Sequence, residues 1–334
     1  MRKPSEAAGK LSSEFDLIAR LSAGIHLSRR TILGVGDDCA IVARPHGQLL
    51  FTIDSMVENV HFDRRWGTPE MLGARALAVN LSDIAAMGGR PTACVVNLGV
   101  REGIASRTLE RIYSGLRAAA REASTDIVGG NITRARELSI TIALIGEAGR
   151  RAMRRDTARP GDEIFVTGML GDAALGWRLL AGKLKARGDA KNNRAATKYL
   201  VERFLRPHAR LYAGQRLAAL RPAPAAIDIS DGLIQDLGHI LERSGVGAEI
   251  DASQIPISPA YRALTGGDLV HALTGGEDYE LIFCVRPGRS ESELSRRLRV
   301  GVRRIGKIVR GRRLNVIGAS APIDGGWDQL RSRG

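Results

Sequence analysis

Apolar residues recur along this chain in two patterns, and each pattern predicts one kind of element. Short apolar runs bounded by glycine, proline or charged residues predict strands. Pro69 opens a segment that stays largely apolar as far as Met87 and ends at Gly88 and Gly89, which predicts one long helix. Together these patterns predict strands at 40–43, 49–53, 93–98, 126–128, 138–147, 163–167 and 225–229, and helices from about 13, at 69–87, 106–122, between 171 and 220, and at 231–243.

Both halves of the chain mix strands with helices, which is typical of α/β or α+β architecture. An arginine-rich stretch over 150–160 runs into Arg159-Pro160-Gly161-Asp162 and interrupts the pattern. The length of 334 residues suits about two domains. We therefore expect an N-terminal domain over 1–150 and a C-terminal domain over 151–334.

The bulk composition predicts a cytoplasmic protein. No run approaches the roughly 18 apolar residues of a membrane-spanning helix, and the charged N-terminus lacks the apolar stretch of a secretory signal. The three cysteines, Cys39, Cys94 and Cys284, are odd in number and far apart in the sequence. They match neither a disulfide framework nor a zinc finger, so a reducing compartment fits best.

The net charge of +14 is the one unusual bulk property. It is compatible with nucleic acid as a partner, but the basic residues are dispersed and only 4% of residues are aromatic, which leaves little for stacking on bases. An arginine-rich surface also suits polyphosphate substrates. Nucleic acid is therefore the less favoured partner.

Aspartates at the ends of predicted elements are the main candidates for chemistry. Asp37 and Asp38 follow glycines in a predicted turn, and Asp54 ends the strand at 49–53. Asp83 shares a helix face with Asn80 in a segment that is apolar almost all round, so its carboxylate needs a cation or strong donors. Solvated turn acids, helix caps and an internally hydrogen-bonded Asp83 remain the structural alternatives.

Two further segments combine polar residues with glycine. Gly129 and Gly130 precede Asn131 after a predicted strand, which would let backbone N–H groups approach a phosphate, and an ordinary hairpin or turn is the structural alternative. Asp228 and Asp231 span the end of a strand and the start of a helix, where either Ser230 or Asp231 would otherwise act as the cap. Mg²⁺ prefers one or two carboxylates together with phosphate oxygens and water. The pattern predicts a magnesium–phosphate site.

The sequence lacks the other common nucleotide and metal signatures. It contains no Gly-x-x-x-x-Gly-Lys-Ser/Thr, no Gly-x-Gly-x-x-Gly before a helix, no protein-kinase catalytic loop and no His-Glu-x-x-His. A P-loop enzyme, a dinucleotide-binding fold and a zinc protease are therefore not supported.

Taken together and in order, these segments resemble the thiamine-monophosphate kinase family, within the ATP-binding superfamily of aminoimidazole ribonucleotide synthetase and selenophosphate synthetase. The similarity covers roughly residues 14 to 330. The segments that carry it are Gly34-Val35-Gly36-Asp37-Asp38-Cys39-Ala40, Thr52-Ile53-Asp54 with His61-Phe62, 76–88 around Asp83, Gly129-Gly130-Asn131, Arg159-Pro160-Gly161-Asp162, 228–240 around Asp231, Gly275-Gly276-Glu277-Asp278-Tyr279-Glu280-Leu281 and Gly326-Trp327-Asp328.

This resemblance implies an aminoimidazole ribonucleotide synthetase-like fold: an N-terminal domain of mixed sheet and helices, a C-terminal α/β domain, and a homodimer joined through the N-terminal sheets. It implies ATP- and Mg²⁺-dependent phosphorylation of thiamine monophosphate to thiamine diphosphate. By position, the metal ligands would be Asp38, Thr52, Ile53, Asp54, Asp83, Asn131, Asp228 and Asp231. The nucleotide contacts would be Gly130, Asn131, Arg155, Ser230 and Tyr113, and the acceptor contacts His61, Glu277 and Trp327.

One position departs from the family pattern. Many relatives have Asp where this chain has Asn131, which keeps a carbonyl oxygen but loses a charge, so the number of magnesium ions stays open. Two rival interpretations remain. One is a related ATP-dependent enzyme with another acceptor, although no Cys precedes Cys39 to serve as the reactive residue of a selenophosphate synthetase. The other is a basic nucleic-acid-binding protein on an ATPase-like fold.

Overall fold

The computed structural model describes residues 14–35, 39–149, 151–184 and 190–318. Their contacts divide the protein into two units. The first contains the chain as far as Pro45 together with Phe51–Asn80 and Pro91–Gly146, and the second contains His46–Leu50, Leu81–Arg90 and the chain from Glu147 on. Two earlier segments thus join the second half of the chain, and the helix that bears Asp83 begins in one unit and ends in the other.

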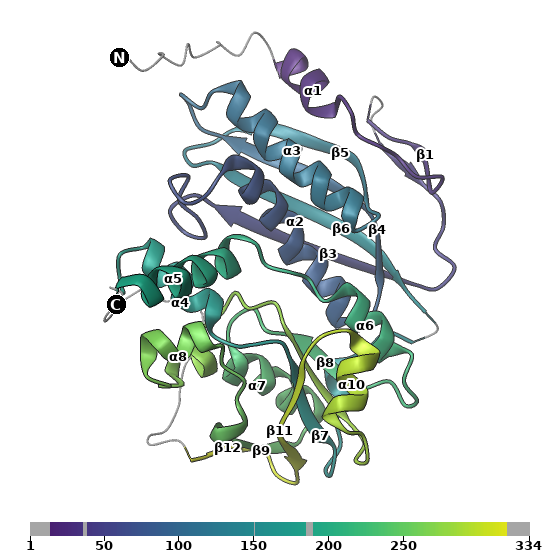
Figure 1. Ribbon diagram of the computed structural model, residues 1–334. Helices are drawn as coiled ribbons and strands as arrows, with labels where there is room; N and C mark the ends of the chain where they lie inside the picture. Colours follow the sequence, from purple (N-terminus) through teal and green to yellow (C-terminus); the bar gives the residue numbers. More distant parts are fainter. Residues whose placement is uncertain (1–13, 36–38, 150, 185–189, 319–334) are drawn as a thin grey trace. The chain divides into compact units, whose positions relative to one another are not determined.

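A four-stranded sheet with strand order β3-β6-β4-β5 forms the centre of the first unit. Helices α2 and α3 lie on one face of it (Figure 1). A Cβ atom on Gly73 would lie 1.9 Å from the carbonyl oxygen of Ile112, so the two helix backbones pack too closely for a larger residue there. The elements are α1 Glu14–Ser22, β1 Thr31–Leu33, β2 Ile41–Val42, β3 Gln48–Val57, α2 Pro69–Ala86, β4 Arg90–Val100, α3 Ser106–Glu122, β5 Asp126–Arg134 and β6 Ser139–Ala148.

Strand β3 lies at an edge of this sheet and carries apolar side chains on both faces. Leu50 and Met56 are buried, whereas Phe51 and Ile53, which point the other way, are 70% and 60% exposed. An exposed apolar edge strand is a surface on which another chain can pair or pack.

A six-stranded sheet with order β12-β9-β11-β7-β10-β8 forms the centre of the second unit. All its ladders are antiparallel except the parallel pair β9 and β12. The elements are a 3₁₀ turn Arg155–Thr157, β7 Glu163–Thr167, α4 Asp172–Leu180, α5 Ala190–Leu205, α6 Leu211–Ala218, β8 Ala225–Asp228, α7 Leu233–Ser244, β9 Gly247–Asp251, a 3₁₀ turn Ala252–Gln254, α8 Pro259–Thr265, α9 Val270–Thr274, β10 Leu281–Val285, α10 Glu291–Leu298, β11 Val302–Val309 and β12 Leu314–Ile317.

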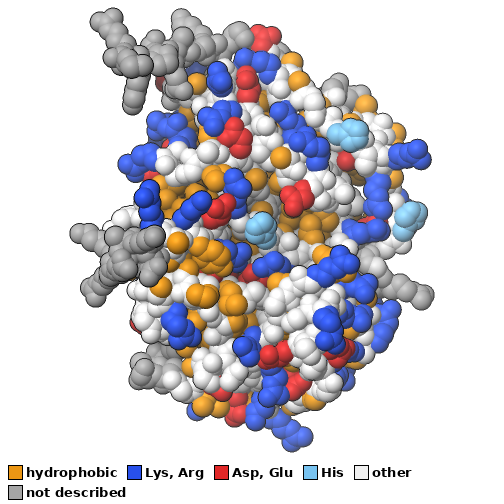
Figure 2. Space-filling model, viewed as in Figure 1, with side chains coloured by type: hydrophobic (Ala, Val, Ile, Leu, Met, Phe, Trp, Pro, Cys, Tyr) orange, Lys and Arg blue, Asp and Glu red, His pale blue; other side chains and the backbone are white. Residues whose placement is uncertain are grey.

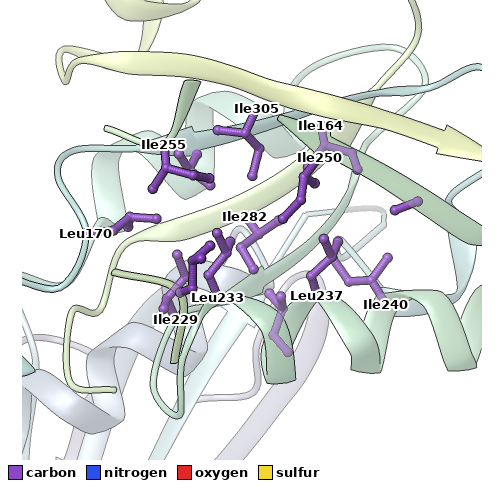
Figure 3. Packing of buried hydrophobic residues seen from close by; sticks show 14 of the residues in the cluster. Ile164, Leu170, Ile229, Leu233, Leu237, Ile240, Ile250, Ile255, Ile282 and Ile305 are labelled. Atoms are coloured by element: carbon purple, nitrogen blue, oxygen red, sulfur yellow. The ribbon is translucent and has the colours of Figure 1, made fainter. Parts of the chain in front are cut away.

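Successive residues of β7 and β10 point to opposite faces of this sheet, so each strand contributes to two cores. Ile164 and Ile282 pack in a cluster that includes Leu233 and Leu237 of α7 (Figure 3). On the other face Phe165 stacks on Phe283, with ring centroids 5.6 Å apart, in a second cluster that includes residues of α6 and α10. Apolar side chains on both faces explain why these central strands are continuous hydrophobic runs.

Several elements differ from the sequence prediction in extent. Helix α3 and strand β7 have the predicted bounds, but β3 continues to Val57, so Asp54 lies inside a strand and not at its end. Strand β5 likewise continues to Arg134, so Gly129, Gly130 and Asn131 form part of the strand and not a turn after it. Over the described residues, no helix is both long enough and apolar enough to cross a membrane.

Candidate active site

Two carboxylates of the second unit lie near each other where α2 and β8 meet. Asp228 ends β8 and is 4% exposed, and the hydroxyl of Ser82 on α2 donates to its Oδ2 at 2.6 Å. Burial, followed by the negative charge of Asp83, raises the pKa of Asp228 to about 6. The fold therefore holds two acidic groups close together, although their charges repel.

The 228–232 loop that follows β8 is fixed by a third carboxylate. Oδ2 of Asp236 on α7 accepts the backbone N–H groups of Ser230, Asp231 and Gly232, at 3.1, 3.0 and 3.0 Å. Neither Ser230 nor Asp231 caps the helix, contrary to the structural alternative stated for them, because α7 begins only at Leu233 with Gly232 at the cap position, and Asp236 accepts the N–H groups of the loop. Burial, with the charge of Asp228, raises the pKa of Asp236 to about 7.

Asp231 and Arg155 complete the polar groups around this loop. Asp231 is partly exposed and accepts a hydrogen bond from Gln235 Nε2 at 3.3 Å. Arg155 lies on the 3₁₀ turn Arg155–Thr157, is exposed, and its charge lowers the pKa of Asp228. The second unit thus places the positive charge of Arg155 near the Asp228 carboxylate.

These residues fit a divalent cation only when the cation has other ligands as well. Among the described side chains, no three His, Cys, Asp or Glu residues come together as a complete protein cage. Asp83 and Asp228 instead provide two hard oxygen donors whose mutual repulsion a cation would relieve, and Mg²⁺ characteristically adds phosphate oxygens and water to such a pair. The pair therefore suits a metal that arrives with a polyphosphate.

The first unit carries the remaining described candidates on its sheet. Thr52 and Asp54 lie on one side of β3, whereas Ile53 points to the opposite face, so Ile53 could offer a metal only its carbonyl oxygen. Asn131 on β5 pairs with Asn97 on β4, and its Nδ2 donates to Asn97 Oδ1 at 3.1 Å. That bond orients the amide of Asn131.

Gly130 and Tyr113 differ in their access to solvent. Gly130 is exposed on β5, and a Cβ atom there would lie 2.2 Å from the carbonyl oxygen of Val96, so only glycine fits this position of the sheet. Tyr113 lies on α3 and is 7% exposed, and burial raises the pKa of its hydroxyl to about 12. A role of Tyr113 in binding a nucleotide stays a prediction.

His61 has a defined hydrogen-bonding state. The backbone N–H of Val57 donates to His61 Nδ1 at 3.1 Å, and Arg75 Nη1 donates to the His61 carbonyl at 3.2 Å. Because Nδ1 is an acceptor, the neutral ring carries its proton on Nε2. His61 is thereby a donor at Nε2.

The 275–280 loop lies directly beside the 228–232 loop. The N–H of Glu277 donates to the Ser230 carbonyl at 2.8 Å, and the N–H of Tyr279 donates to the Ile229 carbonyl at 2.8 Å. Glu277 is partly exposed, and the Tyr279 hydroxyl lies 3.2 Å from its Oε2. The predicted acceptor residue Glu277 is thus tied by main-chain hydrogen bonds to the loop that bears Asp228, Ser230 and Asp231.

The predicted residues therefore fall into three groups. The second unit brings together Asp83, Arg155, Asp228, Ser230, Asp231 and Glu277. Thr52, Ile53, Asp54, His61, Tyr113, Gly130 and Asn131 belong to the first unit. Asp38 and Trp327 lie outside the described residues. Sequence reasoning missed Ser82 and Asp236; an acidic residue four positions after Gly232, in the first turn of a helix, was the available signal for Asp236.

Comparisons with known proteins show the family to which the chain belongs. Residues 36–148 match the family model of AIR synthase related protein, N-terminal domain, and residues 159–319 match that of its C-terminal domain. Thiamine-monophosphate kinase of Salmonella typhimurium is 41% identical over 278 residues, which are 81% of this chain and 82% of the relative.

Two solved structures are similar over nearly the whole chain. Thiamine-monophosphate kinase from Stenotrophomonas maltophilia K279a is 38% identical with a TM-score of 0.78, covering 92% of this chain and 96% of that one. AaThiL complexed with AMPPCP and TMP is 32% identical with a TM-score of 0.74, covering 99% of each chain. The chain belongs to the thiamine-monophosphate kinase family of AIR synthase related proteins.

Proposed function

We propose that this protein transfers the γ-phosphoryl group of ATP to the phosphate of thiamine monophosphate, which yields thiamine diphosphate and ADP. One observation carries the proposal: a chain 41% identical to a thiamine-monophosphate kinase holds Asp83 and Asp228 together with Arg155 at the end of β8, beside the loop that bears Glu277. The relative solved with AMPPCP and TMP supports both substrates.

The chemistry requires no general base. A phosphate monoester has a second pKa near 6, so the attacking oxygen is already largely ionised at neutral pH. The obstacle is repulsion, because each pair of unit charges about 4 Å apart costs roughly 4 kcal/mol at an effective dielectric of about 20. The task of the site is therefore to offset charge and to hold the two phosphates in line.

In this proposal the aspartates hold magnesium and do not accept protons. When bound, Mg²⁺ neutralises charge on the transferring phosphoryl group and orients its oxygens. The proposed ligands are Asp38, Thr52, Ile53, Asp54, Asp83, Asn131, Asp228 and Asp231. Arg155 adds a positive charge toward the polyphosphate, and Gly130, Asn131, Ser230 and Tyr113 complete the proposed nucleotide contacts.

Three residues are proposed to bind the acceptor. His61 donates from Nε2 to the acceptor phosphate, which agrees with the hydrogen bond that its Nδ1 accepts. Glu277 accepts from the aminopyrimidine or offsets the cationic thiazolium ring. Trp327 stacks on the cationic ring through a cation–π contact.

The protein is further proposed to be a cytoplasmic homodimer. The exposed apolar side chains Leu49, Phe51 and Ile53 on β3 support association through the sheet of the first unit. All three cysteines are free, as is usual in a reducing compartment.

A product assay with several acceptors tests the function. Purified protein with ATP and Mg²⁺ should form thiamine diphosphate from thiamine monophosphate, whereas thiamine and pyridoxal should yield no phosphorylated product. Absence of thiamine diphosphate over a range of Mg²⁺ concentrations would overturn the proposal. The nucleic-acid alternative instead requires salt-sensitive binding to DNA or RNA. It is not favoured, because on the face drawn in Figure 2 the Lys and Arg side chains are dispersed among Asp and Glu.

A further inference from the structure

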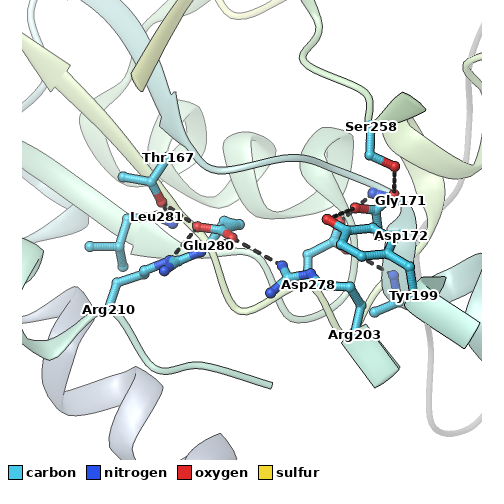
Figure 4. A network of polar contacts seen from close by, with 11 residues as sticks. Thr167, Gly171, Asp172, Tyr199, Arg203, Arg210, Ser258, Asp278, Glu280 and Leu281 are labelled. Carbon is cyan, nitrogen blue, oxygen red and sulfur yellow. Dashed lines mark hydrogen bonds and ion pairs between the residues drawn. The ribbon is translucent and has the colours of Figure 1, made fainter. Parts of the chain in front are cut away.

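Two buried carboxylates, Asp278 and Glu280, alternate with Glu277 and Tyr279 in the 275–280 loop, and the phosphoryl transfer described above uses neither. Asp278 and Glu280 are each 1% exposed. Carboxylates are rarely buried this deeply unless they are paired, so the burial of each one needs a structural or functional reason. Figure 4 shows both with their partners.

Glu280 is held by two arginines. Oε1 lies 3.0 Å from Arg203 Nη2 and Oε2 lies 2.6 Å from Arg210 Nε, while a second hydrogen bond from Arg210 Nη2 reaches Oε1. The hydroxyl of Thr167 donates to Oε2 at 2.7 Å, and a Cβ atom on Gly168 would lie 2.1 Å from Oε1. The Glu280 carboxylate is thus enclosed by Arg203 and Arg210 on one side and by the end of β7 on the other.

Asp278 is held at the start of helix α4. Its Oδ2 accepts the N–H of Gly171 at 2.6 Å, and its Oδ1 accepts the N–H of Ala173 at 3.3 Å. These N–H groups have no partner inside the helix, and the positive end of the helix dipole favours a carboxylate there. The loop is therefore anchored through its side chains on both sides of Tyr279.

The backbone is strained at the residue before each of these anchors. Glu277 and Tyr279 have φ angles of 73° and 52°, in the left-handed region that favours glycine. Such conformations persist only where the surroundings determine them, and they concentrate at functional sites. Here the two strained residues donate their N–H groups to Ser230 and Ile229.

We propose that Arg203 and Arg210 are positioning residues for the phosphate acceptor. By holding Glu280, they keep the 275–280 loop in its strained conformation and thereby fix the Glu277 carboxylate relative to the 228–232 loop. This inference rests on the proposed function, in which Glu277 meets the acceptor.

A purely stabilising role explains this arrangement less well. Buried ion pairs contribute little net stability compared with apolar residues of the same size, because their desolvation offsets their attraction. A bidentate arginine–carboxylate pair does fix geometry, since its hydrogen bonds are directional. A loop in which two non-glycine residues have left-handed φ angles requires its backbone geometry to be fixed in this way.

Steady-state kinetics of Arg210→Ala and Glu280→Gln test the proposal, with Arg286→Ala as the matched control. Arg286 also pairs with a carboxylate of the second unit, Asp162 at 2.8 Å, but its side chain is exposed. Arg210→Ala and Glu280→Gln should each raise KM for thiamine monophosphate about tenfold or more, because small displacements of positioning groups are costly. KM for ATP should change little. The control should leave both KM values unchanged, and Arg210→Lys should recover part of the loss.

Equal increases in both KM values, or a lowered Tm with an unchanged KM for thiamine monophosphate, would overturn the proposal. Glu280→Gln keeps the shape of the side chain and so serves if Arg210→Ala does not fold.

Hydrogen exchange separates this inference from the proposed function. Arg210→Ala should speed amide exchange of Glu277 and Tyr279 about tenfold or more relative to wild type and to Arg286→Ala, whether or not thiamine monophosphate is turned over. Unchanged exchange would refute the anchoring role, while a wild-type protein that makes no thiamine diphosphate would refute the function alone.

Discussion

Replacing Asp83 with Asn should abolish turnover and at the same time stabilise the metal-free protein. Both effects follow from the position of Asp83 beside the buried Asp228, whose pKa rises from 3.8 to about 6 because of burial and then of the Asp83 charge. A proposed magnesium ligand is lost in the variant, but so is the repulsion between Asp83 and Asp228 that the metal-free fold must tolerate. Stability and activity therefore change in opposite directions.

The magnitude follows from the pKa of Asp228. A shift from 3.8 to about 6 corresponds to about 3 kcal/mol at ~1.4 kcal/mol per pKa unit. Burial is the larger cause, so we assign roughly 1 kcal/mol to the charge of Asp83. In a domain of this size, that free energy corresponds to an increase in Tm of roughly 2–4 °C.

The effect should depend on pH in a defined direction. A carboxyl group with a raised pKa binds its proton more tightly in the folded state, so the folded state loses stability as pH rises from 3.8 through about 6. The gain from Asp83→Asn is therefore full above that range and vanishes below it.

Thermal unfolding with a chelator present measures this gain at both ends of the pH range. Asp156→Asn is the control, because Asp156 is paired with Arg154 on the protein surface and its pKa is lowered by that partner. It should not raise Tm. Addition of Mg²⁺ and ATP should then stabilise wild type more than Asp83→Asn. Wild-type turnover in Asp83→Asn, or a metal-free Tm at neutral pH no higher than that of wild type, would refute the reasoning.

Three further predictions concern other parts of the chain. Asn131→Asp, which introduces the carboxylate that the family resemblance implies at this position, should lower the Mg²⁺ concentration needed for half-maximal activity; an unchanged Mg²⁺ titration would argue against a ligand role. Phe51→Asp, on the exposed apolar face of β3, should convert a dimer to monomers in light scattering, whereas an unaltered mass would exclude that face as the interface. The pKa of Glu70 is lowered to about 2 by its hydrogen bond with Arg111, so the pair contributes stability that is present above pH 4.5 and lost as pH falls toward 2. Glu70→Gln should accordingly cost less than about 1 kcal/mol in urea unfolding near neutral pH and nothing at the acid end, because the pair is largely exposed; a pH-independent difference would contradict this.

The predicted bounds of an element are correct where several local signals in the sequence agree with one another. Helix α3 has the predicted bounds because its buried residues recur at helical spacing, and β7 because a short apolar run ends at Gly168. Strands β3 and β5 extend beyond their apolar runs, because neighbouring strands provide ladder partners for polar residues such as Asn131. Partners far away in the sequence leave no local signal.

The candidate site shows the same limit of prediction from local sequence patterns. Aspartates in the right order were visible in the sequence, and their resemblance to a family suggested their roles. The hydrogen bond between Ser82 and Asp228 joins residues 146 positions apart, and no periodicity predicts it. The left-handed conformations of Glu277 and Tyr279 arise from tertiary contacts alone, since neither residue favours them intrinsically.

Transfer of label from γ-³²P-ATP tests the central claim most directly. Incubated with Mg²⁺ and thiamine monophosphate, the protein should place the label in the terminal phosphate of thiamine diphosphate, and Asp83→Asn should place none there. Label recovered only in inorganic phosphate, or only in unreacted ATP, would contradict the account.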